Sequence, residues 1–170
     1  MGAVARVVAP QGKTGDPIRD SALGLVPETV DQIARLNHHA WRSSPVRASL
    51  LEIVRLRNAR TVNCQFCKSV RYDVARRDGL TENKVDQIAD GYEQSGLSDE
   101  EKLAVAFADA YLHEPKAMSA ELASRLKKHF TPAQLAHLAI ALIAFNATSR
   151  CAVTIGGMPE NLPVTEISAP

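Results

Sequence analysis

Start signals for α-helices recur along this chain from Pro27 onward, whereas the alternating apolar and polar stretches typical of β-strands are nearly absent. Two capping boxes, at 98–101 and 131–134, are the strongest of these signals, because the first and last residues of each box cap one helix start reciprocally. Apolar residues follow both boxes at helical spacing. The sequence therefore predicts an all-α fold, a single-domain bundle of about six or seven helices.

The spacing of apolar residues predicts helices over 27–41, 45–63 and 64–77. Further helices are expected to begin after the capping residues Thr81, Ser98, Ser119 and Thr131. The helix that follows Thr131 is apolar nearly all round as far as Phe145. We therefore expect that helix to lie centrally, in the core or in an oligomer interface.

A length of 170 residues favours one domain that is large enough to bury a sizeable core. Residues 1–20 contain several Gly and Pro residues without a sustained period, so we expect them to form a tail or an arm lying on another surface. Residues 21–157 hold the expected helical domain. Residues 158–170 are rich in proline and are expected to form an extended C-terminal tail.

Charge and hydropathy exclude several classes of protein. The net charge is +1, from 20 Lys and Arg against 19 Asp and Glu, which argues against a general nucleic-acid binder. The longest apolar run, 135–145, is shorter than the ~18 residues of a membrane span and is interrupted by His137. The N-terminus has no continuous apolar stretch of the kind found in secretory signals. We therefore expect a cytoplasmic protein that does not bind nucleic acid or membranes.

Two of the three cysteines form a Cys-x-x-Cys pair, Cys64 and Cys67. Cysteines three residues apart on one helix lie on the same face, and Asn63 is a good capping residue directly before them. The free N–H groups and partial positive charge of a helix N-terminus favour thiolate over thiol, and thiolate is the nucleophile. A dithiol so placed can attack a peroxide or a disulfide and then form an internal disulfide.

Two other interpretations of the cysteine pair stay open, an inert buried pair and half of a metal site. Zinc would need four ligands. The remaining candidates are Cys151 and five scattered histidines, none at a convincing spacing from the pair. We therefore expect no metal and no organic cofactor. Cys151 itself is expected to be a small buried hydrophobe.

Glu52 lies twelve residues before Cys64, in the preceding predicted helix and among Leu51, Ile53 and Val54. A carboxyl group in apolar company holds its proton more tightly and can serve as a proton donor or acceptor. The alternative is a carboxylate on the helix surface that pairs with Arg55 or Arg57.

Residues 51–57 together with 63–67 resemble the carboxymuconolactone decarboxylase family, most closely its branch of alkyl hydroperoxidase D-like proteins. The signature of that branch is a Glu, eleven intervening residues, the Cys-x-x-Cys pair and a nearby His. Weaker matches follow at 97–102, at Ala108-Asp109 and at 145–150, so the resemblance covers roughly residues 27–157.

The resemblance implies an all-helical subunit that assembles as a homotrimer or homohexamer. It also implies a thiol-dependent peroxidase or dithiol–disulfide oxidoreductase that takes a small hydroperoxide or disulfide substrate and an external dithiol reductant. Carried over by position, Cys67 is the peroxidatic cysteine, Cys64 the resolving one, and Glu52 the acid/base of a proton relay. Helix geometry alone favours Cys64 as the more ionised thiol, so which cysteine attacks stays open.

The sequence departs from the family pattern at the histidine, since the position four residues after Cys67 is Arg71. An arginine stays protonated and cannot shuttle a proton, but it can favour a thiolate or bind an anionic substrate. The adjacent Tyr72 is a second candidate, as a hydrogen-bond partner. Two alternatives to a peroxidase follow: a non-catalytic redox-responsive or ligand-binding module, and a lyase of the decarboxylase type in which Arg71 holds the anion. The decarboxylase branch generally lacks the cysteine pair.

Overall fold

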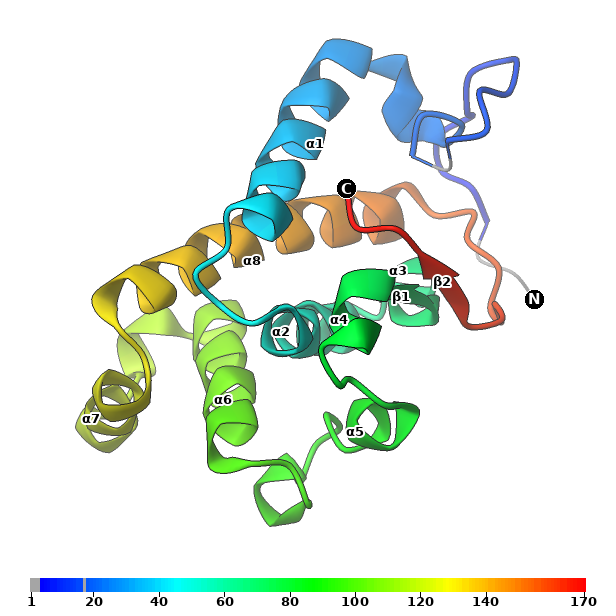
Figure 1. The fold of residues 1–170 in the computed structure, drawn as a ribbon. Coiled ribbons are helices and arrows are strands. Elements are labelled where there is room, and N and C mark those ends of the chain that lie inside the picture. The colour runs from blue at the N-terminus through cyan, green and yellow to red at the C-terminus, as the bar shows by residue number, and fades with distance from the viewer. Residues whose placement is uncertain (1–3, 17) are drawn as a thin grey trace.

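Helix α2 (Ala48–Thr61) runs through the middle of the molecule, and two of the other long helices pack directly on it (Figure 1). This computed structural model describes residues 4–16 and 18–170. Helices α6 (Asp99–His113) and α8 (Pro132–Ile155) pack directly on α2, and α1 (Pro27–Arg42) packs on α8. Since α2 is covered on several sides, its polar residues lie inside the molecule together with its apolar ones.

The shorter elements complete the fold. They are α3 (Gln65–Ser69), β1 (Val70–Tyr72), α4 (Asp73–Arg77), α5 (Glu82–Asp86), α7 (Ala120–His129), β2 (Thr165–Ile167) and the 3-10 helices η1 (Ala22–Leu25), η2 (Tyr92–Gln94) and η3 (Pro115–Ala117). The predicted all-α class is confirmed, because the described residues form eight α-helices and a single sheet of two short strands. Assembly into an oligomer stays a prediction.

The single helix predicted over 64–77 is wrong, and this accounts for the larger number of helices. The segment divides into α3, β1 and α4. Strand β1 pairs in parallel with β2, with Val70 opposite Thr165. The backbone oxygens of Cys67 and Val70, which a continuous helix would bond internally, accept hydrogen bonds from Arg55 instead. Tertiary partners thus replace the helical ladder in this segment.

Two apolar clusters hold α2 in place. One joins its Leu51 and Val54 to the buried side chains Leu138 and Leu142 of α8. The other cluster packs Ile53, from a different side of α2, against α4, α5 and α6. Burying a leucine or valine side chain fully contributes about 1.5–3 kcal/mol. This double packing fixes the position of the side chains that α2 presents to its neighbours.

Helix α8 packs against the core with one face only. Its apolar composition on nearly all sides predicts a more completely buried helix. Leu138, Leu142 and Phe145 are buried, whereas Ile140 and Ile143 are 49% and 51% exposed. Within residues 4–16 and 18–170, α8 is the one helix that length and composition would allow to cross a membrane. A core helix meets the same criteria, and α8 packs against both α1 and α2.

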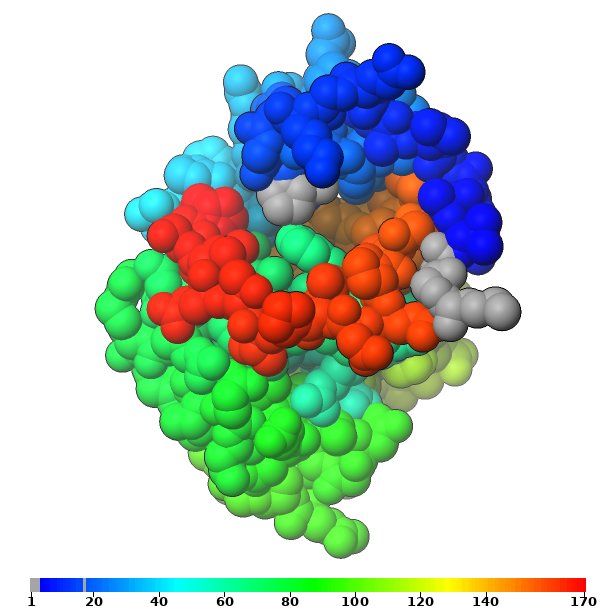
Figure 2. Space-filling model, turned by 90° about the vertical axis from the view of Figure 1, so that its right-hand side faces the viewer, coloured from blue at the N-terminus to red at the C-terminus, as the bar shows by residue number. Residues whose placement is uncertain are grey.

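The chain segments before α1 and after α8 lie over the helices. Figure 2 shows the C-terminal segment, in red and orange, crossing one face below the N-terminal arm, in blue. The Ser69 hydroxyl donates to the Leu162 carbonyl, so this segment lies directly on α3. Residues 1–3 and 17 of the expected arm lie outside the described residues, and the boundaries at residues 20 and 157 stay predictions.

The N-terminus of α2 is capped from a distant part of the chain, by Asp78. The Asp78 carboxylate accepts the Ser49 N–H at 2.9 Å. Burial raises the pKa of Asp78, but the hydrogen bonds from Ser49 and the charge of Arg47 outweigh it, so the pKa lies below its ordinary 3.8. We expect Asp78→Ala to lower the free energy of unfolding at pH 7 by about 0.5–2 kcal/mol.

The pH dependence of this loss has a definite sign. A carboxylate whose pKa is lowered by folding stabilises the fold fully above 3.8, and this contribution disappears as the pH falls through the folded-state pKa. Urea denaturation of wild type and Asp78→Ala should therefore give curves that converge below pH 3.8. A difference that persists at lower pH would contradict a charge-dependent cap.

Candidate functional site

Cys64 and Cys67 are joined by a disulfide bond at the start of α3, with their Cα atoms 5.3 Å apart. Cys64 is the N-cap residue of α3, and its sulfur accepts the Cys67 N–H at 3.3 Å. The cap was expected at Asn63, which instead turns the chain between α2 and α3 with a positive φ of 58°. Asn adopts this left-handed conformation more readily than most residues. The turn brings both sulfurs to the same end of α3.

The two cysteines differ in their access to solvent. Cys64 is fully buried, whereas Cys67 is half-buried. Phe66, between them, is exposed. Among the described residues each sulfur has one hydrogen-bond donor, so the number of donors does not distinguish them. Accessibility does: an external molecule reaches Cys67 more easily than Cys64.

Glu52 is fully buried in α2 and is paired with Arg55. Its two carboxylate oxygens accept hydrogen bonds from Arg55 Nε and Nη2, each at 2.6 Å, and one oxygen also accepts the Tyr72 N–H at 3.4 Å. The carboxylate is therefore neither in purely apolar surroundings nor on the helix surface. One of the two interpretations from the sequence was a surface carboxylate paired with Arg55 or Arg57. The pairing with Arg55 is confirmed, but the pair lies in the interior.

Arg55 connects this carboxylate to the cysteine segment. Its guanidinium donates to the Cys67 carbonyl oxygen at 2.8 Å and to the Val70 carbonyl oxygen at 2.7 Å. Burial lowers the pKa of Arg55, and the Glu52 carboxylate outweighs this, so the pKa is raised and the charge is kept. The described contacts of Glu52 thus reach the Cys67 backbone through Arg55 and do not include either sulfur. The proton-relay role of Glu52 stays a prediction.

Arg71 and Tyr72 lie next to each other in β1, where successive side chains point to opposite faces. The Arg71 guanidinium is buried and donates to both carboxylate oxygens of Glu82, at 3.0 and 3.1 Å, and to the carbonyl oxygens of Lys68 and Val70. Neither sulfur is among its described contacts. Among the described contacts, Arg71 therefore forms no hydrogen bond with either cysteine sulfur.

Tyr72 lies instead with Glu52 and Arg55. Its ring packs edge-on against Trp41, with centroids 4.6 Å apart, and the Arg55 guanidinium lies 5.2 Å from its centroid. Burial raises the pKa of Tyr72; Arg55 lowers it and Glu52 raises it, and the net shift is upward. Tyr72 is therefore a neutral hydroxyl at ordinary pH and a packing partner of the buried ion pair.

Ser149 and Asn58 are site residues to which the sequence pattern did not point. The Ser149 hydroxyl donates to the Cys67 sulfur at 3.3 Å, and Asn58 Nδ2 donates to Ser149 Oγ at 3.1 Å. Both side chains are buried, Asn58 in α2 and Ser149 in α8. Ser149 follows the long apolar run of α8, which is a signal that could have found it. Asn58 is one of several polar residues in α2, and its position there carries no such signal. Residues 145–150 entered the sequence comparison only as a weak family match.

Cys151 is exposed, so the prediction that it is buried is wrong. It follows the buried Ser149 by two residues in α8 and therefore points to the opposite side of that helix. Among residues 4–16 and 18–170, no group of three His, Cys, Asp or Glu side chains is placed to hold a metal ion.

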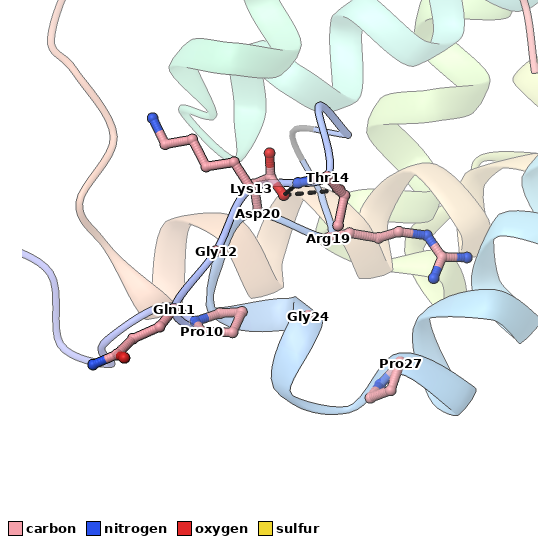
Figure 3. A pocket seen from close by; sticks show the side chains of 9 residues that line it. All are labelled: Pro10, Gln11, Gly12, Lys13, Thr14, Arg19, Asp20, Gly24 and Pro27. Atoms are coloured by element: carbon pink, nitrogen blue, oxygen red, sulfur yellow. Dashed lines mark hydrogen bonds between the residues drawn. The ribbon is translucent and has the colours of Figure 1, made fainter.

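A hollow lies in the N-terminal arm, and neither cysteine of the pair lines it. It has a volume of about 380 Å³ and is lined by residues between Pro10 and Pro27, none of which is a predicted site residue. Figure 3 shows that Thr14 and Asp20 point toward each other there, and Asp20 accepts the Thr14 hydroxyl at 2.8 Å. Arg19 pairs with Asp31. Asp20 is thus engaged within the arm, whereas Arg19 joins the arm to α1.

No family model matches this chain. The uncharacterized protein Rv2313c of Mycobacterium tuberculosis H37Rv is 31% identical over 106 residues, which are 62% of this chain and 37% of that protein. The uncharacterized protein YnjA of Escherichia coli K12 is 30% identical over 110 residues, 64% of this chain and 60% of YnjA. The chain therefore spans less than two thirds of the length of each relative.

A solved structure has the same fold. It is the crystal structure of ATU0492 from Agrobacterium tumefaciens, described as a protein of unknown function with a suggested role in antioxidant defence as AhpD. The TM-score is 0.70, the sequences are 20% identical, and the alignment covers 88% of this chain and all of that one. At this identity the similarity shows the fold alone, and it is the fold that the family resemblance implies.

Proposed function

We propose that this protein is a thiol-dependent peroxidase, a dithiol–disulfide oxidoreductase that reduces small hydroperoxides with Cys67 and Cys64. The observation that carries the proposal is the geometry of the pair: two sulfurs in bonding contact, of which Cys67 is accessible and Cys64 is buried. A two-cysteine cycle requires an accessible nucleophile and a second sulfur within bonding reach of it, and both conditions are met here. The shared fold with a protein of suggested antioxidant role supports the same class of activity.

The proposed cycle balances in three steps. The Cys67 thiolate attacks the terminal oxygen of R–O–O–H, the O–O bond breaks, and the products are Cys67–SOH and an alkoxide that takes a proton from water. The Cys64 thiol then attacks the sulfenic sulfur, which forms the disulfide and releases water. Finally an external dithiol reduces the disulfide by thiol–disulfide exchange and is itself oxidised to a disulfide.

In this proposal the buried ion pair positions the cysteine segment. Arg55 binds the Cys67 and Val70 carbonyl oxygens and is itself held by both oxygens of Glu52. These contacts support a positioning role for Glu52, exerted through Arg55, more directly than the proton relay that the resemblance implies. The engagement of Arg71 by Glu82 gives no support to an anion-binding site of a lyase.

The proposal includes two kinds of partner, an external dithiol reductant and further copies of this chain. A reducing cytoplasm would supply the external dithiol that the cycle consumes. The homotrimer or homohexamer expected from the resemblance would have an apolar surface available in Ile140 and Ile143 of α8. Both are part of the proposal.

The test is a reaction of the reduced protein with one equivalent of hydroperoxide. We expect the intact mass to fall by two hydrogen atoms, and peptide mapping to place the new bond between Cys64 and Cys67. With excess dithiothreitol, peroxide consumption should continue catalytically. A disulfide that forms without catalytic turnover would favour the redox-responsive module, and the lack of any disulfide would sink the dithiol cycle.

A further inference from the structure

We infer that a one-way chain of hydrogen bonds, which begins at Arg150 on the surface, ends on the Cys67 sulfur and makes Ser149 the residue that holds this sulfur as a thiolate. The inference rests on the proposed redox role of Cys67 and deepens it. It assigns a positioning function to Ser149, Asn58 and Asn146, none of which belongs to the family signature.

The chain has four links. Arg150 Nε donates to Asn146 Oδ1 at 2.9 Å, and Asn146 Nδ2 donates to Asn58 Oδ1 at 2.8 Å. Asn58 Nδ2 donates to Ser149 Oγ at 3.1 Å, and the Ser149 hydroxyl donates to Cys67 Sγ at 3.3 Å. Every link therefore runs in the same direction, from the cation to the sulfur.

The cation fixes this direction. A guanidinium only donates, so Asn146 must present its oxygen to Arg150 and its NH₂ group to Asn58. Asn58 must then receive that NH₂ group with its oxygen, which leaves its own NH₂ group for Ser149. Since Ser149 Oγ already accepts a hydrogen bond, its proton is available for the sulfur. The amide orientations and the hydroxyl direction thus follow from one charged group.

The placement of these residues supports an effect at the sulfur. Ser149 and Arg150 lie three and four residues after Asn146 in α8, so each of them is a neighbour of Asn146 on the helix surface. Arg150 is exposed, whereas Asn58 and Ser149 are buried. Hydrogen bonds are stronger where water is excluded, and each bond in a chain polarises the next. The donor that reaches Cys67 therefore acts in the part of the chain that water does not reach.

A hydrogen bond donated to a thiolate stabilises the charged form and lowers the pKa of the thiol. Cys64 receives its donor from the backbone N–H of Cys67, which a side-chain substitution does not remove. Among the described contacts, Ser149 is thus the side chain that donates a hydrogen bond to the cysteine pair. This stabilisation of the thiolate does not depend on the family's histidine, whose position is occupied by Arg71.

The experiment measures the thiol pKa of Cys67 in the fully reduced protein, from the pH dependence of its alkylation by iodoacetamide, with peptide mass spectrometry to assign the site. We expect Ser149→Ala to raise this pKa, with an about tenfold lower thiolate fraction below both values. Ser149→Thr keeps the hydroxyl and should restore the wild-type profile. An unchanged profile in Ser149→Ala would overturn the inference.

A second variant tests the direction of the chain from its far end. Arg150→Glu replaces the donor by an acceptor, so both amides should reverse and Ser149 should donate to Asn58 in place of Cys67. We expect a rise in the Cys67 pKa that persists in 1 M salt, where the Debye length is about 3 Å and the direct effect of an exposed charge is screened. A Cys67 pKa that does not change, or whose change disappears in 1 M salt, would contradict the inference that Arg150 sets the direction of the hydrogen bonds.

The outcomes separate this inference from the proposed function. The pKa is measured on the reduced thiol without peroxide, so a rise in both variants supports the chain even if wild type shows no turnover. Normal turnover in wild type with unchanged pKa values in both variants leaves the peroxidase intact and rejects the chain. Because Arg150 is exposed, its variant keeps the test available if Ser149→Ala does not fold.

Discussion

Cys67→Ser is expected to reduce peroxide consumption to the background rate of the buffer and dithiol, because it removes the accessible sulfur that attacks the peroxide. Cys64→Ser should behave differently. Its Cys67 still attacks, so without added dithiol one equivalent of hydroperoxide is reduced per protein and the sulfenic acid persists, which a dimedone adduct detected by mass spectrometry would show. The burial of Cys64 is the reason for this asymmetry.

Cys151→Ser is the matched control, since it removes an exposed cysteine that the cycle does not use. Its rate of peroxide consumption should equal that of wild type. If Cys67→Ser instead formed a dimedone adduct at Cys64 and reduced one equivalent of peroxide, the two roles would be the reverse of those proposed. The helix geometry considered from the sequence favoured that reversed assignment.

Glu52→Gln is expected to lower the free energy of unfolding by about 3–5 kcal/mol, because it leaves the buried Arg55 charge without its counter-ion. Urea denaturation followed by circular dichroism measures this loss. Glu100→Gln is the control: it removes a carboxylate from the partly exposed pair with Arg47, and such pairs contribute about 0–1 kcal/mol.

The same Glu52 variant distinguishes a positioning role from a proton relay. A residue that acts through Arg55 should alter stability and leave the pH profile of turnover in the folded protein with its original shape. A relay acid/base should alter that profile. An unchanged stability together with a changed pH profile would therefore make the relay the better account of Glu52.

The parts of the fold that the sequence predicted are those fixed by neighbouring residues. The boxes opened by Ser98 and Thr131 do form, because each needs only side chains and N–H groups within one helical turn. The break in the segment 64–77 could not be predicted in this way. It depends on β2, which comes from residues 165–167, and on Arg55 from α2. Helical periodicity carries no information about such distant partners.

The features of the site also divide into those fixed by neighbouring residues and those that depend on distant parts of the chain. The contact between Cys64 and Cys67 follows from a spacing of three residues, and the pairing of Glu52 with Arg55 was one of two alternatives for the same local reason. The occupation of Arg71 by Glu82 depends on how β1 and α5 are placed. The approach of Ser149 to Cys67 depends on how α8 packs across α2, which no local pattern in this sequence specifies.

The disulfide is held from the interior while the two residues between its cysteines lie toward solvent. Arg55 and Ser149 bind the Cys67 segment from α2 and α8, whereas Phe66 is exposed and Gln65 is half-buried. The residues that support the disulfide are therefore distinct from the two residues that lie between its cysteines. Under the proposed function, substitutions at Gln65 and Phe66 would change the surroundings of the accessible sulfur of Cys67 and leave the inner supports in place.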